Sequence, residues 1–170
     1  AESMILQMGP LLKMIGEQPV TVSERLLHAQ FALETMYRFA SNQEDYGFYD
    51  ISRHQQMLIA SLFQPQLSRS AAPVLGAIAT PDAIRALVTL ASQDTEELAS
   101  RQVAVEALDK AIQKCGLLLN SGEVQRVYDL YNISLAVKDD EIVELLGSIL
   151  DAIEGPYRRK QQANSGEDTP

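Results

Sequence analysis

The residue types that most often carry chemistry are few in this chain, and their spacing is unfavourable for it. His28 and His54 are the two histidines, and each lies in a segment of helical period without Cys, Asp or Glu at metal-ligand spacing on the same face. Cys115 is the single cysteine, and only Lys114 lies near it, whereas a nucleophilic thiolate needs a base. We therefore expect packing or surface roles for the histidines, a buried thiol on an apolar helix face, and no catalytic residue, metal site or cofactor.

Paired carboxylates, which can exchange protons in acid–base catalysis, occur at Glu96-Glu97 and at Asp139-Asp140-Glu141. Both groups fall at expected helix starts, where the helix dipole alone favours negative charge. The sequence has no glycine-rich phosphate loop, serine nucleophile elbow or zinc-protease helix motif. We interpret these acids as capping residues and expect that the protein is not an enzyme.

Composition limits the partners that the chain can bind. The formal net charge of −9 opposes attraction to phosphate backbones and to anionic lipid, so we expect neither nucleic acid nor membrane as a partner. The 170 residues are 46% hydrophobic and 22% charged, which is typical of one globular domain. The start Ala1-Glu2-Ser3 lacks Met, so we expect that residues preceded it, a cleaved signal peptide being one alternative.

Nearly every segment has a helical period, and none alternates as a strand would. Helix starts are indicated by Thr21 with Glu24, by Thr80-Pro81-Asp82 and by Asn120 with Glu123. Pro73 fits a helix over 68–79 only in its first turn, and Gly155-Pro156 is expected to end the last helix. We predict an all-α fold of seven or eight helices in one domain, 1–156, followed by a disordered polar tail, 157–170. The expected buried face of the helix after Thr21 holds Leu26, Leu27, Gln30, Leu33, Met36, Tyr37 and Ala40.

An internal repeat indicates how these helices are arranged. Arg-x-x-Ala begins at Arg69 and again at Arg101, 32 residues later, and small residues follow at helical spacing in both segments. Small side chains allow helix backbones to approach closely. Between the two segments, Thr80-Pro81-Asp82 opens a partner helix and Asp94 lies in the following turn.

Over residues 68–116 this pattern resembles a HEAT repeat. The resemblance implies an α-α superhelix of stacked antiparallel hairpins that binds or scaffolds another protein without catalysis. In such stacks the second helices line the concave surface, which makes one polar face of the helix over 97–115 a candidate binding strip: Gln102, Glu106, Asp109 and Gln113. The loop aromatics Tyr46, Phe48 and Tyr49 are candidate interface anchors.

Two other interpretations stay open at this point. A small helical enzyme or ligand-binding bundle would bring polar residues together in a concave pocket, with His54 or the loop over 46–49 lining it. Alternatively, the chain is a fragment of a longer repeat array, and its apolar start, Met4-Ile5-Leu6 with Met8, forms a weak homodimer interface.

Overall fold

The computed structural model is helical throughout the part of the chain that it describes, residues 21–41, 50–138 and 140–165, with 156–165 described by their backbone alone. No strand occurs in these ranges, so the predicted all-α class is confirmed. The predicted segment over 4–15 and the loop aromatics of 46–49 lie outside the described residues. The helices are α2 (Val22–Ser41), the 3₁₀ helix η1 (Ile51–His54), α4 (Gln55–Leu62), α5 (Ser68–Ile78), α6 (Pro81–Ser92), α7 (Leu98–Cys115), α8 (Ser121–Val137) and α9 (Asp140–Ser165).

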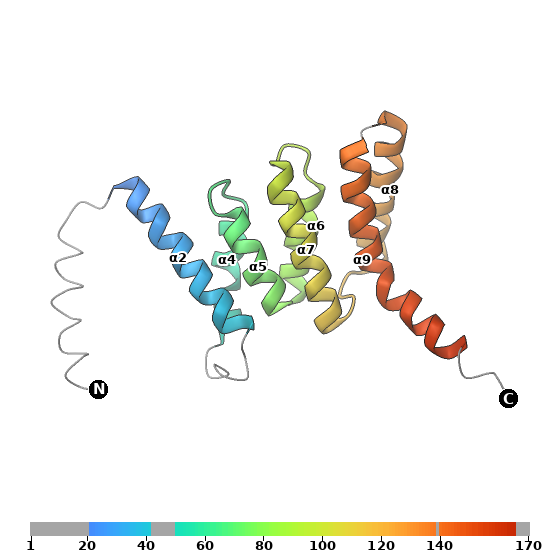
Figure 1. Cartoon of the computed structure of the whole chain (residues 1–170), viewed down its shortest axis with the longest axis horizontal. Helices are drawn as coiled ribbons and strands as arrows, with labels where there is room; N and C mark the ends of the chain where they lie inside the picture. The colour runs from blue at the N-terminus through green and yellow to red at the C-terminus, as the bar shows by residue number, and fades with distance from the viewer. Residues whose placement is uncertain (1–20, 42–49, 139, 166–170) are drawn as a thin grey trace.

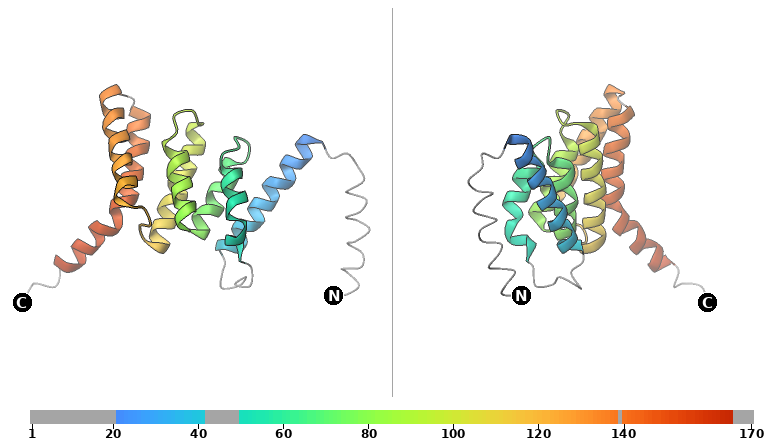
Figure 2. Two further views of the ribbon diagram at one scale, coloured as in Figure 1. Left: turned by 180° about the vertical axis from the view of Figure 1, so that it is seen from behind. Right: turned by 60° about the vertical axis from the view of Figure 1, so that its left-hand side comes forward.

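The helices form three hairpins that stack side by side: α4 with α5, α6 with α7, and α8 with α9 (Figure 1). α2, α5, α7 and α9 make one layer, in which each helix packs against the next. We call this the second-helix layer, and we call α4, α6 and α8, which face the viewer in the left view of Figure 2, the first-helix layer. The predicted architecture of stacked antiparallel hairpins is therefore present.

Local capping chemistry sets the helix starts where the sequence indicated them. The Thr80 hydroxyl accepts a hydrogen bond from the Ala83 N–H at 3.3 Å, and Pro81 is the first residue of α6. Asn120 and Glu123 bond reciprocally, the Glu123 N–H to the Asn120 side chain at 3.0 Å and the Asn120 N–H to the Glu123 carboxylate at 2.8 Å. These side chains satisfy amide groups that a helix start leaves without a partner.

The third predicted helix start is also present, and local groups set two further helix boundaries. Thr21 and Glu24 form a reciprocal capping box before α2, with bonds of 2.8 and 3.2 Å. Asp50 accepts from the Ser52 N–H at 3.2 Å and caps η1, which is a 3₁₀ turn rather than the first turn of one continuous helix. Gly116 ends α7 with φ of 79°, a left-handed value that favours glycine.

The expectation that Pro73 lies in a first helical turn is wrong. α5 begins at Ser68, so Pro73 is in the helix interior, where it offers no N–H to the carbonyl of Arg69. The helix continues because packing outweighs that lost bond, as shown by flanking side chains with 0% exposure: Ala71, Ala72, Val74 and Leu75.

The expected end of the last helix at Gly155-Pro156 is also wrong, because α9 runs on to Ser165. Figure 1 shows that α9 changes direction about half-way along. A proline inside a helix removes one hydrogen bond and commonly produces such a bend instead of a stop. The predicted disordered tail over 157–170 is therefore wrong as far as Ser165.

Cys115 is exposed, in contrast to its predicted place on a buried face. Ile112 is the last buried residue of α7, and the final turn from Gln113 to Cys115 is exposed throughout. The helical period correctly relates Cys115 to Ile112, but the described helices leave the side chains of that last turn exposed.

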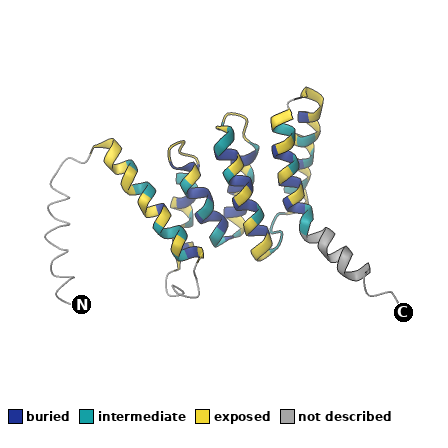
Figure 3. Ribbon diagram, viewed as in Figure 1, coloured by how far each residue is buried: buried dark blue, intermediate teal, exposed yellow. Residues whose placement is uncertain are grey.

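The core lies where α5, α6 and α7 meet (Figure 3), whereas α2 is largely exposed or half-buried. Leu75, Leu87 and Leu108, from these three helices, have 0% exposure. Complete burial of such a side chain contributes about 1.5–3 kcal/mol each. The central hairpins therefore hold the stack together.

α5 and α7 approach each other closely at two points, and the residues that meet are 32 positions apart in sequence at one point and 31 at the other. The buried Ser68 hydroxyl donates to the Ser100 hydroxyl at 2.9 Å. Further along, a Cβ placed on Gly76 would lie 2.7 Å from the backbone oxygen of Ala107. The internal repeat of 32 residues therefore corresponds to two stacked helices, α5 and α7, that are in contact.

The two arginines of the 32-residue repeat, Arg69 and Arg101, have different surroundings in the structure. Arg101 is buried, its Nε donates to the Ala91 carbonyl at 2.9 Å, and its Nη2 lies 3.8 Å from the Asp94 carboxylate. Arg69 is exposed and pairs with Glu97 across the stack at 2.5 Å. The serines that precede them, rather than the arginines, are the equivalent residues.

We predict that Gly76→Ala lowers the free energy of unfolding by about 1–3 kcal/mol, the usual cost of overpacking, because its Cβ meets the Ala107 backbone and the helices must separate. Gly147→Ala is the matched control in α9, since its nearest atom, on the Tyr131 ring, would be 3.7 Å away. Alanine there is expected to be neutral or stabilising, by up to about 1 kcal/mol. Urea unfolding measures both, and equal effects would contradict the close approach.

Candidate functional site

Between α7 and α9 lies an open groove of about 510 Å³, which we call the acidic groove. Three predicted binding residues of α7, Gln102, Glu106 and Asp109, line it. Burial explains why they point there, because α7 turns its apolar side toward the core and leaves this side toward α9. The other lining residues are Val105 of α7 and Leu145, Ser148, Asp151 and Ala152 of α9.

The remaining predicted residue of the strip, Gln113, does not line the groove. Its side-chain amide donates to the Asp109 carboxylate at 2.6 Å, so it fixes the position of a groove carboxylate from one turn away. The aromatic candidates Tyr46, Phe48 and Tyr49 lie outside the described residues and stay a prediction.

A second open groove, of about 650 Å³, lies between α2 and α5 on the same layer. We call it the aromatic groove, and the sequence analysis missed it. Leu27 was assigned to the buried face of its helix, but it is 63% exposed, and Phe31, one turn later, is 70% exposed. The i, i+4 spacing of two large apolar residues was the available signal. The groove is lined by Leu27, Gln30, Phe31, Glu34, Tyr37, Ser70, Pro73 and Lys110.

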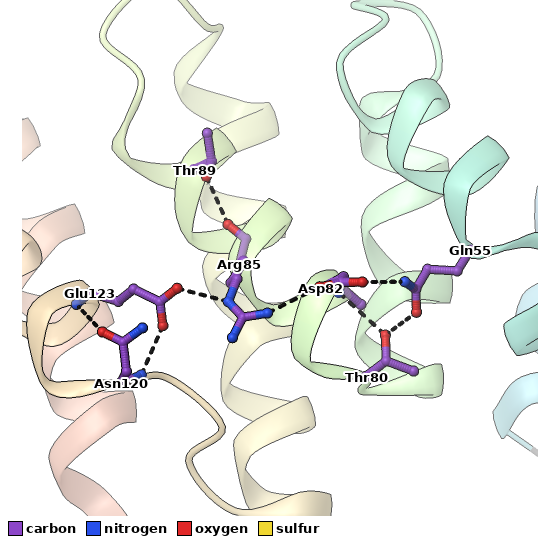
Figure 4. Close-up of polar contacts among 8 residues, drawn as sticks. Gln55, Thr80, Asp82, Arg85, Thr89, Asn120 and Glu123 are labelled. Atoms are coloured by element: carbon purple, nitrogen blue, oxygen red, sulfur yellow. Dashed lines mark hydrogen bonds and ion pairs between the residues drawn. The ribbon is translucent and has the colours of Figure 1, made fainter.

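The first-helix layer carries a polar network (Figure 4), beside a third open groove of about 340 Å³ between α6 and α8. The Gln55 amide of α4 donates to Asp82 at 3.0 Å and accepts from the Thr80 hydroxyl at the start of α6. Arg85 of α6 bonds Asp82 at 3.0 Å and Glu123 of α8 at 2.7 Å. Side chains from three successive hairpins are thereby connected.

Two charges of this network, on Glu123 and Arg85, are favoured in their ionised forms. The pKa of Glu123 is lowered first by the hydrogen bond from the Asn120 backbone N–H and then by Arg85. The pKa of Arg85 is raised, chiefly by its hydrogen bond to Glu123. A carboxylate with a lowered pKa is a poor proton donor near neutral pH, so this network joins hairpins and is unsuited to acid–base chemistry.

The other chemically interesting residues lie apart from one another. His28 and His54 are both exposed, on α2 and η1. Glu97 is the N-cap residue of α7, but its side chain makes no capping hydrogen bond and pairs with Arg69 instead. Asp140 and Glu141 lie in the first turn of α9, as expected for acids favoured by the dipole.

In the described ranges, no three His, Cys, Asp or Glu side chains come together as a metal site. None of the helices within those ranges combines the length and apolar character needed to cross a membrane. Comparison of the chain with family models, with curated proteins and with solved structures finds no match.

We predict that Glu123→Gln lowers the free energy of unfolding at pH 7 by about 0.5–1 kcal/mol, because the charge serves both the helix start and Arg85. The folded-state pKa is lowered, so this contribution is complete above the unfolded-state pKa, about 4.3, and is lost as the pH falls through the folded-state value.

Urea unfolding at pH 7 and at pH 3 tests this prediction, and the difference between the variant and the parent should shrink at pH 3. Glu144→Gln changes an exposed carboxylate of α9 outside the network and is the control. If Glu123→Gln lowers the free energy of unfolding as much at pH 3 as at pH 7, the Glu123 charge does not stabilise the contact between α6 and α8.

Proposed function

We propose that this chain is a non-catalytic helical-repeat module, similar to HEAT repeats, that binds another protein through its second-helix layer. The observation that carries the proposal is the presence of two open grooves on that one layer, each lined by residues of neighbouring helices. Both are lined by mixed polar and apolar side chains, as protein interfaces are.

Two features of the central hairpins support a HEAT-like repeat. Asp94 in the turn and Arg101 in the second helix lie within 3.8 Å of each other, and both belong to the motif that suggested the family. The Ser68–Ser100 bond joins corresponding positions of consecutive second helices. A repeat of this kind produces an extended surface without requiring an enclosed pocket.

A ligand-binding bundle is less well supported. Such a bundle should gather polar residues from distant helices into one concave site. The residues of the acidic groove come from two adjacent helices, and His54 lines neither that groove nor the aromatic groove. We therefore favour a protein ligand laid across the layer.

Site-specific photocrosslinking tests the proposal. A photoreactive amino acid is placed at Gln102 or Phe31 on the second-helix layer and, as controls, at Met57 or Asp129 on the first-helix layer, all exposed. We predict that the first two positions crosslink to the same protein in a native lysate and that the controls do not. Equal labelling from both layers, or none from the grooves, would contradict the proposal.

A further inference from the structure

The first half of α2 exposes large apolar side chains beside the aromatic groove. Leu27 and Phe31 line this groove one turn apart, and they are 63% and 70% exposed. Val22, the first residue of α2, is 85% exposed. Single exposed apolar residues are ordinary, but neighbouring ones beside a groove mark interaction sites. The described helices therefore leave an apolar surface open on this part of α2.

The chain has an apolar segment shortly before α2, residues 4–15, which we call the apolar segment. Eight of its 12 residues are Leu, Ile or Met, and Lys13 is its one charged residue. Pro10 does not exclude a helix here, because α5 continues through Pro73. Spacings of four, three and four residues would put one row of apolar residues on a single helix face: Met4, Met8, Leu11 and Ile15.

The aromatic groove and the apolar segment have complementary chemistry. Phe31 and Tyr37 are the aromatic residues that line the groove. Three of the five methionines of the chain, Met4, Met8 and Met14, belong to the segment. The Met thioether packs favourably against aromatic rings, and its unbranched side chain adapts to an irregular surface. With a single charge in the segment, hydrophobic burial would drive the contact.

The connection to α2 brings the apolar segment within reach of this surface. A helix of 12 residues is about 18 Å long, which matches the part of α2 that carries the exposed apolar residues. Residues 16–21 lie between the segment and α2, and the hairpins α4–α5 and α6–α7 are each joined by five residues. Helices joined by so short a connection pack as antiparallel neighbours.

We propose that the apolar segment forms a helix that packs in the aromatic groove, antiparallel to α2. In this arrangement Leu11 lies beside Leu27. Met8 lies beside Phe31, one turn further along both helices. The contact removes the exposed apolar side chains of α2 from water, which stabilises it. It does not depend on the proposed protein-binding function.

Other occupants suit this surface less well. Residues 42–49 follow the opposite end of α2, about 15 Å along the helix axis from Phe31. A second copy of the chain carries the same net charge of −9, which opposes its approach. Its association would also cost translational freedom, whereas a segment linked to α2 has a high effective concentration at the groove.

The apolar segment and a partner protein would compete for the same groove. A partner bound along the second-helix layer reaches Phe31 only after it displaces the segment. This competition, unlike the contact itself, rests on the proposed function.

Hydrogen exchange of the full chain, measured by mass spectrometry on peptides from residues 1–20, tests the contact. We expect amide exchange over the apolar segment to be at least about tenfold slower than in an isolated peptide of the same sequence. Leu27→Ser/Phe31→Ser in the groove, or Met8→Ser/Leu11→Ser in the segment, should remove this protection. The protection in the parent should be independent of protein concentration.

Two matched controls should leave the exchange slow. Met57→Ser changes an exposed apolar residue of α4 in the first-helix layer. Lys13→Ser changes the face of the segment opposite Met4, since nine residues at 100° each amount to half a turn beyond two full turns. Circular dichroism verifies that every variant is folded, as expected for substitutions away from the core.

Three results would overturn the proposal. The first is exchange over the apolar segment of the parent at the rate of the isolated peptide. The second is slow exchange that Leu27→Ser/Phe31→Ser leaves unchanged, which would place the segment elsewhere. The third is protection that appears only as the concentration rises, together with a dimer in sedimentation, which would assign the groove to a second copy. Photocrosslinking from Gln102 decides protein binding separately in each case.

Discussion

The close approach of α5 and α7 is the contact on which the rest of the stack depends. At Gly76 the absence of a Cβ allows the backbones to meet, and at Ser68 a buried hydrogen bond to Ser100 fixes their register. These contacts set the rotation of α7 about its axis, so that Ala104 and Leu108 face the core. The same rotation directs Glu106 and Asp109 toward α9 and creates the acidic groove.

The two layers use their charges differently. In the first-helix layer, Arg85 and its carboxylate partners satisfy one another and join consecutive hairpins. In the second-helix layer, Glu106 and Asp109 of α7 line the open acidic groove together with apolar residues such as Val105 and Leu145. The second-helix layer also contains an ion pair, Arg69 with Glu97, but its two grooves leave polar and apolar side chains open to a partner. This difference is the physical basis for assigning binding to the second-helix layer.

Local signals in the sequence were sufficient for most of the fold. The capping residues Thr80 and Asn120 predicted helix starts because their hydrogen bonds reach only three residues along the chain. The sequence-based expectations failed where tertiary contacts decide the structure. Packing against neighbouring helices keeps α5 helical at Pro73. The described helices leave Cys115 exposed at the end of α7. The helical period put Gln102, Glu106 and Asp109 on one face, and all three line the acidic groove; that they bind a partner stays a prediction. It did not reveal the exposure of Leu27, which depends on how α2 lies against α5.

The most direct test of the account is methyl NMR of the full chain, titrated with the partner protein that photocrosslinking captures. The account predicts that the methyl signals of Val105 and Leu145, in the acidic groove, and those of Leu27, in the aromatic groove, shift on titration. Those of Val88 and Val127, which line a groove of the first-helix layer, should stay in place. Shifts confined to Val88 and Val127 would contradict it and would assign binding to the opposite layer.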